Sequence, residues 1–202
     1  MVTAKKVTAI YGGSFNPVHT GHIALARQLL RLGGLDEIWL MVSPQNPLKR
    51  SSDLLDDTKR LEMTRVALSA EAGMVASDYE FHLPRPSYMW NTLCALSHDY
   101  PDREFVLVIG ADNWTVFSRW YHADDIIRHY RILIYPRTGY DIDKTTLPQG
   151  VTLVETGRFD VSSTMVRERL KEGLPIDGLV PEIIVPLVER YYKSVSETEQ
   201  VR

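Results

Sequence analysis

The fold is decided by the stretch from Val7 to His22, which reads VTAIYGGSFNPVHTGH. Its first five residues form a β-branched, largely apolar run that is typical of a buried strand, and a glycine pair follows at once. Beyond it, apolar residues recur at helical spacing from Ile23 to Leu30, and Gly33–Gly34 supplies a stop. The pattern therefore predicts a strand that passes through a glycine turn into a helix, which is a βα unit.

The same alternation continues along the rest of the chain. Further strands are expected at Glu37–Val42, Met74–Ala76, Phe105–Ile109, Ile132–Tyr135 and Val151–Val154, and further helices at Thr58–Ala70, Ser87–Ser97, Ser163–Glu172 and Pro181–Tyr192. Alternation of this kind is typical of an α/β protein in which helices cover both faces of a mainly parallel sheet. We expect a single domain over residues 1–192 and a polar tail over residues 193–202 that frays.

Composition limits the classes of partner. The chain has 202 residues, 44% of them hydrophobic, which is enough for one sizeable core. Its formal net charge of -3 lacks the basic excess that non-specific nucleic-acid binding requires. Cys94 is the single cysteine, which excludes an intrachain disulfide and fits a reducing, cytoplasmic setting. No run approaches the roughly 18 apolar residues of a membrane span, so we expect no membrane partner. A homo-oligomer is compatible with the sequence.

The turn after the first strand has the features of a phosphate site. Gly12 and Gly13 let a ligand approach the backbone closely, and the helix that follows offers unpaired N–H groups and a partial positive charge. His19 and His22 lie three residues apart, so both can point at one anion there. A metal site would need a third ligand nearby, and neither GxGxxG nor GxxxxGK[ST] is present. The stretch predicts an anion site for a phosphate group.

Two motifs resemble the signature of the nucleotidyltransferase superfamily that carries an HxGH motif. They are GGSFNPVHTGH at residues 12–22 and VSSTMVR at residues 161–167, the second similar to ISSTxxR. Members join a nucleoside triphosphate to a phosphorylated acceptor and release pyrophosphate. The resemblance implies a Rossmann-like, doubly wound fold in which two helix N-termini face one polyphosphate, because Ser162 to Thr164 can cap the second helix. Arg169 points to the other side of that helix from Arg167 and is expected to be solvated.

Three further segments are similar to bacterial nicotinate-nucleotide adenylyltransferases. They are PQNPLK at 44–49, PRPSYMWNTL at 84–93, and IGAD at 109–112 followed by Trp120. The resemblance extends from about Val7 to Tyr192. It implies transfer of AMP from ATP to nicotinate mononucleotide in NAD biosynthesis, with Mg²⁺ held through the ATP phosphates and no protein metal site.

The resemblance also implies roles for individual residues. Catalytic roles fall to His19, His22 and Arg167; ATP contacts to Gly12, Gly13, Ser14, Phe15, Gly110, Asp112, Ser162, Ser163 and Thr164; and acceptor contacts to Lys49, Tyr88, Asn91, Thr92 and Trp120. Of the two histidines, His22 is the expected transition-state contact. Asp112 would bind a ribose hydroxyl, Lys49 the acceptor phosphate, and Trp120 the pyridine ring by stacking.

Several alternatives stay open at this level. Asp112 can instead cap a helix, and Trp120 can belong to the core, with Trp114 as the competing stacking residue. Asn16, Met89 and Asn91 depart from the family pattern, which usually has Asp, Thr and Asp there. A preference for nicotinamide mononucleotide or phosphopantetheine, or a non-catalytic nucleotide-binding module, are the competing functions. The connection from Ser43 to Asp57 is long enough to close over a ligand.

Overall fold

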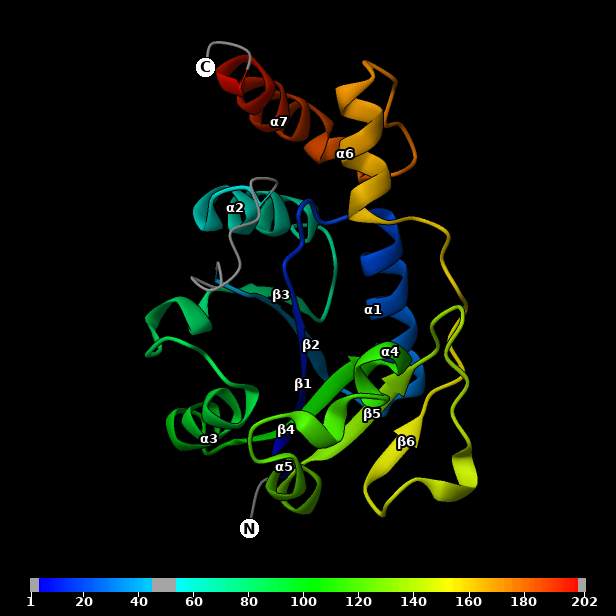
Figure 1. The fold of residues 1–202 in the computed structure, drawn as a ribbon. Helices are drawn as coiled ribbons and strands as arrows, with labels where there is room; N and C mark the ends of the chain where they lie inside the picture. Colours follow the sequence, from blue (N-terminus) through cyan, green and yellow to red (C-terminus); the bar gives the residue numbers. More distant parts are fainter. Residues whose placement is uncertain (1–3, 45–53, 200–202) are drawn as a thin grey trace.

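Six parallel strands form the central sheet of the computed structural model, which describes residues 4–44 and 54–199 (Figure 1). They are β1 (Lys6–Gly13), β2 (Glu37–Val42), β3 (Met74–Ser77), β4 (Arg103–Gly110), β5 (Arg131–Tyr135) and β6 (Val151–Leu153). Their order across the sheet is β3-β2-β1-β4-β5-β6, with every neighbouring pair parallel. The winding reverses between β1 and β4, and the carboxyl ends of strands at such a point are where open α/β sheets bind ligands.

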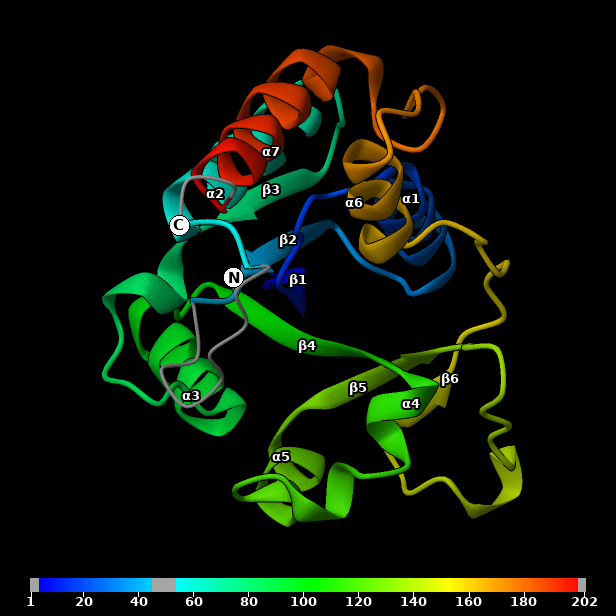
Figure 2. The same ribbon diagram turned by 45° about the horizontal axis from the view of Figure 1, so that its top comes forward.

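Helices cover both faces of this sheet, as the sequence predicts (Figures 1 and 2). They are α1 (Thr20–Leu32), α2 (Asp57–Ala67), α3 (Met89–Asp99), α4 (Ala111–Trp114), α5 (Ala123–His129), α6 (Ser163–Lys171) and α7 (Val185–Glu199). Short 3-10 turns are η1 (Tyr79–His82), η2 (Phe117–Arg119), η3 (Lys144–Thr146) and η4 (Glu182–Ile184). Helices α1, α2, α6 and α7 pack on one face and α3, α4 and α5 on the other. The doubly wound fold is confirmed.

The central strands β1, β2 and β4 are largely apolar because both faces of the sheet are covered there. Leu40 points into the core beneath α1 and α2, while its neighbour Met41 points into the core beneath α3, and neither is exposed. All six residues of β2 are buried. This is why the strands read as continuous hydrophobic runs in the sequence and are the elements it predicts best.

Helix boundaries differ from the predicted ones at several places. Helices α4 and α5 were not predicted, because four and seven residues are too few to show a periodic pattern. The last helix begins at Val185 and runs to Glu199, whereas the sequence placed it at Pro181–Tyr192. Its first-turn proline is Pro186 rather than Pro181, which precedes η4. No helix in the described residues is long and apolar enough to cross a membrane.

Candidate active site

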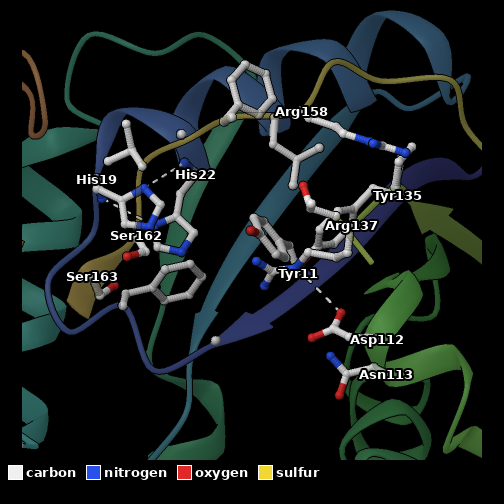
Figure 3. Close-up of a pocket in the computed structure, with 18 of the residues that line it drawn as sticks. Tyr11, His19, His22, Asp112, Asn113, Tyr135, Arg137, Arg158, Ser162 and Ser163 are labelled. Carbon is white, nitrogen blue, oxygen red and sulfur yellow. Dashed lines mark hydrogen bonds and ion pairs between the residues drawn. The ribbon is translucent and has the colours of Figure 1, made fainter. Parts of the chain in front are cut away.

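The first pocket opens at the carboxyl ends of β1, β4 and β5 and has a volume of about 550 Å³ (Figure 3). Its lining comprises Tyr11, Gly12, Gly13, Ser14, Phe15, His19, Gly21, His22, Leu25, Asp112, Asn113, Tyr135, Pro136, Arg137, Thr138, Tyr140, Gly157, Arg158, Phe159, Val161, Ser162 and Ser163. This volume lies in the range of small-molecule sites. The two predicted phosphate motifs therefore meet in one cavity, far apart as they are in the sequence.

His19 and His22 form a capping box at the start of α1. Nδ1 of His19 accepts from the backbone N–H of His22 at 3.3 Å, and Nδ1 of His22 accepts from the backbone N–H of His19 at 3.2 Å. The two rings stack with their centroids 3.5 Å apart. Because both Nδ1 atoms are acceptors, each neutral ring carries its proton on Nε2. The backbone thus sets the tautomer that makes each ring a hydrogen-bond donor.

Both rings are neutral at pH 7. Burial, followed by the charge of Arg137, lowers the pKa of His19 to about 4. Burial, then the charges of His19 and Arg137, holds the pKa of His22 well below its ordinary value. The pair therefore offers two Nε2–H donors without two fixed charges. An anion bound next to the rings would raise their pKa values, which is opposite to the effect of burial.

This pKa shift makes a prediction about stability. Between pH 6.5 and about 4, His19 takes up a proton in the unfolded chain but not in the folded one. The free energy of unfolding therefore falls as pH is lowered through this window, by about 1.4 kcal/mol per pH unit for each such histidine. Urea unfolding at pH 7.0, 6.0 and 5.0 measures the slope. His19→Asn keeps a helix-capping side chain and should show a smaller slope; a slope equal to that of the original chain would contradict the assignment.

Helix α6 brings the second motif to the same place. Ser162 caps it by accepting from the N–H of Met165 at 3.1 Å, and Ser163 Oγ donates to the carbonyl of Pro17 at 2.9 Å. Nη1 of Arg167 donates to the carbonyl of Asn16 at 2.8 Å. The N-termini of α1 and α6 are thus held against one turn, and Figure 3 shows His19, His22, Ser162 and Ser163 gathered at one end of the pocket.

Two members of this motif lie outside the pocket lining in the described structure. Thr164 and Arg167 are not among the lining residues; Nη2 of Arg167 donates instead to Oγ1 of Thr164 at 3.3 Å. Arg169, by contrast, is half-buried and donates to the carbonyl of Pro175 at 2.8 Å. Contacts of Thr164 and Arg167 with phosphate therefore stay a prediction.

Phe15 closes the floor of the turn. Its side chain is 1% exposed and its ring contacts that of His22 edge to face, with centroids 5.0 Å apart. A Cβ at Gly13 would lie 2.9 Å from this ring, so only glycine fits there. Asn16 is also buried, and its Oδ1 accepts from the N–H of Leu55 at 3.2 Å and from the hydroxyl of Tyr192. The turn that carries the histidines is thus supported by packing of Phe15 and by the bonds of Asn16 to Leu55 and Tyr192.

Asp112 lies at the opposite end of the first pocket, next to Arg137 (Figure 3). Its buried Oδ1 has no hydrogen-bond partner within the described residues and faces Nε of Arg137 at 3.5 Å. A Cβ at Gly110 would overlap this oxygen, so glycine there makes room for the carboxylate. A buried acceptor without a donor fits the prediction that a ligand hydroxyl binds to Asp112.

The second pocket, of about 450 Å³, lies beside the first. Its lining comprises Ser43, Pro44, Glu80, Arg85, Pro86, Ser87, Tyr88, Met89, Arg119, Trp120 and Tyr121. Trp120 and Trp114 both contact the ring of Phe117, with centroid distances of 5.1 and 5.2 Å, respectively. Trp120 lines the second pocket and Trp114 does not. Of the two competing tryptophans, the structure therefore places only Trp120 where it can stack on a ligand.

Two predicted acceptor residues, Thr92 and Asn91, lie outside the lining of this pocket. Thr92 is fully buried, and its Oγ1 donates to Oε1 of Glu80 at 3.0 Å. This hydroxyl holds Glu80, which itself lines the pocket and whose pKa is raised by burial; contact of Thr92 with substrate stays a prediction. Asn91 is exposed on α3 outside the lining. Lys49 lies outside the described residues, as does most of the long connection between Ser43 and Asp57.

The two pockets adjoin at the carboxyl end of β1. The N–H of Ser43, in the second pocket, donates to the carbonyl of Gly13, in the first, at 2.9 Å. The Cε atom of Met89 lies 3.5 Å from where a Cβ of Gly12 would be. Ligands in the two pockets would therefore meet near the glycine pair and the histidines.

The sequence did not identify many of the side chains that line the two pockets. The residues concerned are Tyr11, Asn113, Tyr135, Arg137, Tyr140, Arg158 and Phe159 in the first pocket, and Glu80, Arg85, Arg119 and Tyr121 in the second. Tyr135 and Arg137 come directly at the carboxyl end of β5. Position at a strand end was the available signal, since the switch-point rule applies to every strand of the sheet and not only to the first.

Comparisons with known proteins agree with this geometry. The sequence profile of the cytidylyltransferase-like family matches residues 10–169. A probable nicotinate-nucleotide adenylyltransferase from Bacteroides fragilis is 48% identical over 173 residues, 86% of each chain. A relative of the same description from Bacteroides thetaiotaomicron is 50% identical over 168 residues, 83% of each chain.

Solved structures show the same fold. A Plasmodium falciparum nicotinic acid mononucleotide adenylyltransferase complexed with NaAD superposes with a TM-score of 0.77 at 19% identity, over 93% of this chain and 98% of that one. A Vibrio parahaemolyticus structure described as a putative nicotinate-nucleotide adenylyltransferase gives 0.66 at 22% identity, over 91% and 99%. Together with the sequence matches, these findings confirm the resemblance: the chain is a nucleotidyltransferase that belongs to the nicotinate-nucleotide adenylyltransferase family.

Proposed function

We propose that the first pocket binds ATP and the second binds nicotinate mononucleotide, and that the protein joins them into nicotinate adenine dinucleotide with release of pyrophosphate. The observation that carries this proposal is the junction of the two pockets at Gly13 and Ser43, with His19 and His22 lining the first pocket. A 5′-phosphate in the second pocket then has its oxygen next to the α-phosphorus of ATP in the first.

The reaction depends on position and charge more than on proton transfer. The attacking phosphate oxygen is already ionised at neutral pH, so no strong general base is needed. It forms a bond to the α-phosphorus as the bond to pyrophosphate breaks on the opposite side. The Nε2–H donors of His19 and His22 and the N-terminus of α6 would stabilise the charge on the transferring and leaving phosphoryl oxygens.

The other end of the first pocket suits the nucleoside. Asp112 offers an unsatisfied acceptor for a ribose hydroxyl, and Gly110 leaves space for it. Gly12, Gly13, Ser14 and Phe15 would line the path of the phosphates. In the second pocket, Tyr88 and Trp120 would hold the pyridine ring.

Mg²⁺ would reach this site with its substrate. Within the described residues no group of three His, Cys, Asp or Glu side chains is placed to hold a metal ion. The donors that surround the phosphate end, two imidazoles and two serines, suit an anion, so the phosphate oxygens would supply the ligands of the ion. When bound, Mg²⁺ neutralises charge on the leaving pyrophosphate.

Residues 1–192 would form one domain for this activity, because both pockets open at one end of one sheet. The single cysteine, Cys94, supports a reducing, cytoplasmic setting. ATP and a pyridine mononucleotide are the partners we assign; self-association would be measured separately by light scattering.

A pyrophosphate-release assay tests the function. Nicotinate mononucleotide, nicotinamide mononucleotide and phosphopantetheine are each supplied with ATP and Mg²⁺ in parallel reactions. We expect the highest kcat/KM with nicotinate mononucleotide. A higher value with either other acceptor would transfer the assignment to that substrate, and no release with any of them would point to a nucleotide-binding module.

The pyridine site is tested by comparing two tryptophans on either side of Phe117. Trp120→Ala should raise the KM for the pyridine mononucleotide about tenfold, because a stacked aromatic contact is lost, with the KM for ATP little changed. Trp114→Ala removes a ring of the same kind outside the pocket and serves as the matched control. Should Trp114→Ala raise this KM more than Trp120→Ala does, the stacking role belongs to Trp114.

A further inference from the structure

Arg60, on α2, is a charged side chain with no exposure to solvent. Its guanidinium spans three separate pieces of backbone: Nε donates to the carbonyl of Leu55 at 2.8 Å, Nη2 to that of Ser43 at 2.9 Å, and Nη1 to that of Ser14. Its charge is balanced by Asp57, whose Oδ1 accepts from Nη2. A buried charge with this many fixed contacts sets the position of whatever it touches.

Two of those contacts belong to different pockets. Ser14 lines the first pocket and Ser43 lines the second. A third link runs through Asp57, whose Oδ2 accepts from Nη2 of Arg85 at 3.4 Å, and Arg85 also lines the second pocket. One planar group therefore holds a wall of the first pocket and, directly and through Asp57, two walls of the second.

We infer that Arg60 is a positioning residue that fixes the distance between the two substrates. It touches neither ligand: its atoms are buried behind the carbonyls of Ser14 and Ser43. In-line transfer requires the attacking oxygen and the α-phosphorus to be held at a fixed separation, and a displacement of about 1 Å lowers the rate by as much as 100-fold. The inference rests on the proposed function, since it assigns the two substrates to the two pockets.

Arg60→Lys is the variant that separates position from charge. Lysine keeps the positive charge beside Asp57, but its single ammonium does not reach three carbonyls that a planar guanidinium spans. We expect kcat to fall by about 10- to 100-fold while the KM for each substrate stays within about threefold. Each pocket is still formed, and only their relative position is altered.

A ligand that spans both pockets gives a readout that is independent of turnover. Nicotinate adenine dinucleotide is AMP joined to nicotinate mononucleotide, so the product of the two halves' Kd values divided by the Kd of the dinucleotide is an effective concentration. Calorimetric titration of AMP, nicotinate mononucleotide and the dinucleotide gives all three constants. We expect Arg60→Lys to lower this effective concentration about tenfold or more, with the Kd of each half nearly unchanged.

Two further variants control for loss of stability. Met63→Ala, on the same helix, removes a fully buried side chain that lines neither pocket; it should lower Tm without changing the effective concentration. Asp57→Asn keeps the three carbonyl bonds of Arg60 and removes the charge that links Arg60 to Arg85. It should lower the effective concentration in the same direction but by less than Arg60→Lys does, because the bonds to Ser14 and Ser43 remain, and it serves if that variant does not fold.

Two results would overturn the inference. One is a change in Tm alone, with kcat and the effective concentration of Arg60→Lys within threefold of the unaltered protein. The other is a loss of affinity for AMP or for the mononucleotide as large as the loss for the dinucleotide. That result would mean that Arg60 shapes one pocket and not the distance between the two. If the unaltered protein binds neither half, the proposed function fails instead.

Discussion

His22→Ala is expected to lower kcat by about 100- to 1000-fold, the usual loss when one preorganised donor to a developing oxyanion is removed. The backbone N–H of His19 occupies Nδ1 of His22, so the proton on Nε2 is available to the phosphoryl oxygen. Burial keeps the pKa of this ring low in the free protein, so the ring is neutral there. It gains positive character only as negative charge develops on the phosphoryl oxygen. Initial rates at saturating ATP and mononucleotide measure the effect.

The His22→Ala variant also removes half of a capping box, so its thermal stability must be measured together with its kcat. Loss of a cap lowers stability by about 1 kcal/mol, which leaves the chain folded at 25 °C in a domain of ordinary stability. His98→Ala removes a histidine that is exposed at the end of α3 and lines neither pocket. Near-normal turnover by a folded His22→Ala would exclude the transition-state role.

Arg167→Ala is expected to lower kcat/KM for ATP by about 100-fold. Its guanidinium holds the carbonyl of Asn16 at 2.8 Å, so the substitution frees the turn that carries the histidines from the N-terminus of α6. It also removes the cation nearest to Ser163 on that helix, where we place the β- and γ-phosphates. Both effects weaken the grip on the leaving pyrophosphate, and steady-state kinetics with ATP varied measures their sum.

Arg169→Ala provides the matched control, on the same helix and two residues away. Arg169 is half-buried and donates to the carbonyl of Pro175, so its removal changes net charge equally but touches neither the turn nor the pocket lining. We expect kcat/KM for ATP to change by less than about twofold, as for an isolated surface charge. Equal losses in the two variants would mean that Arg167 acts through general electrostatic attraction only.

The sheet was predictable because its central strands are buried on both faces and therefore read as apolar runs. The order in which strands pair was not, since β1 pairs with β4 across almost a hundred residues of sequence. Helices with a clear periodic face, such as α1, were also found, while α4 and α5 are too short to show one. Their positions depend on packing beneath β4 and β5, which the local sequence does not express.

The residues of the site also divide into those with a local signal in the sequence and those without one. His19, His22, Ser162 and Ser163 were identified because glycines and capping residues at a strand–helix turn have a local signature. For Thr92, the sequence does not show that its hydroxyl faces the interior and holds Glu80. Arg60 gave no local signal at all, because its partners come from three separate segments.

By itself, then, the sequence determined the class of fold, the family and the residues at the histidine end of the first pocket, since each depends on residues that are neighbours along the chain. Tertiary structure alone decided which tryptophan faces the second pocket, that Asp112 has a buried acceptor to spare, and that the pockets meet beside the glycine pair. The physical reason is that backbone turns and caps are encoded locally. The distance between two pockets is set by long-range contacts such as those of Arg60, which form only when the sheet is assembled.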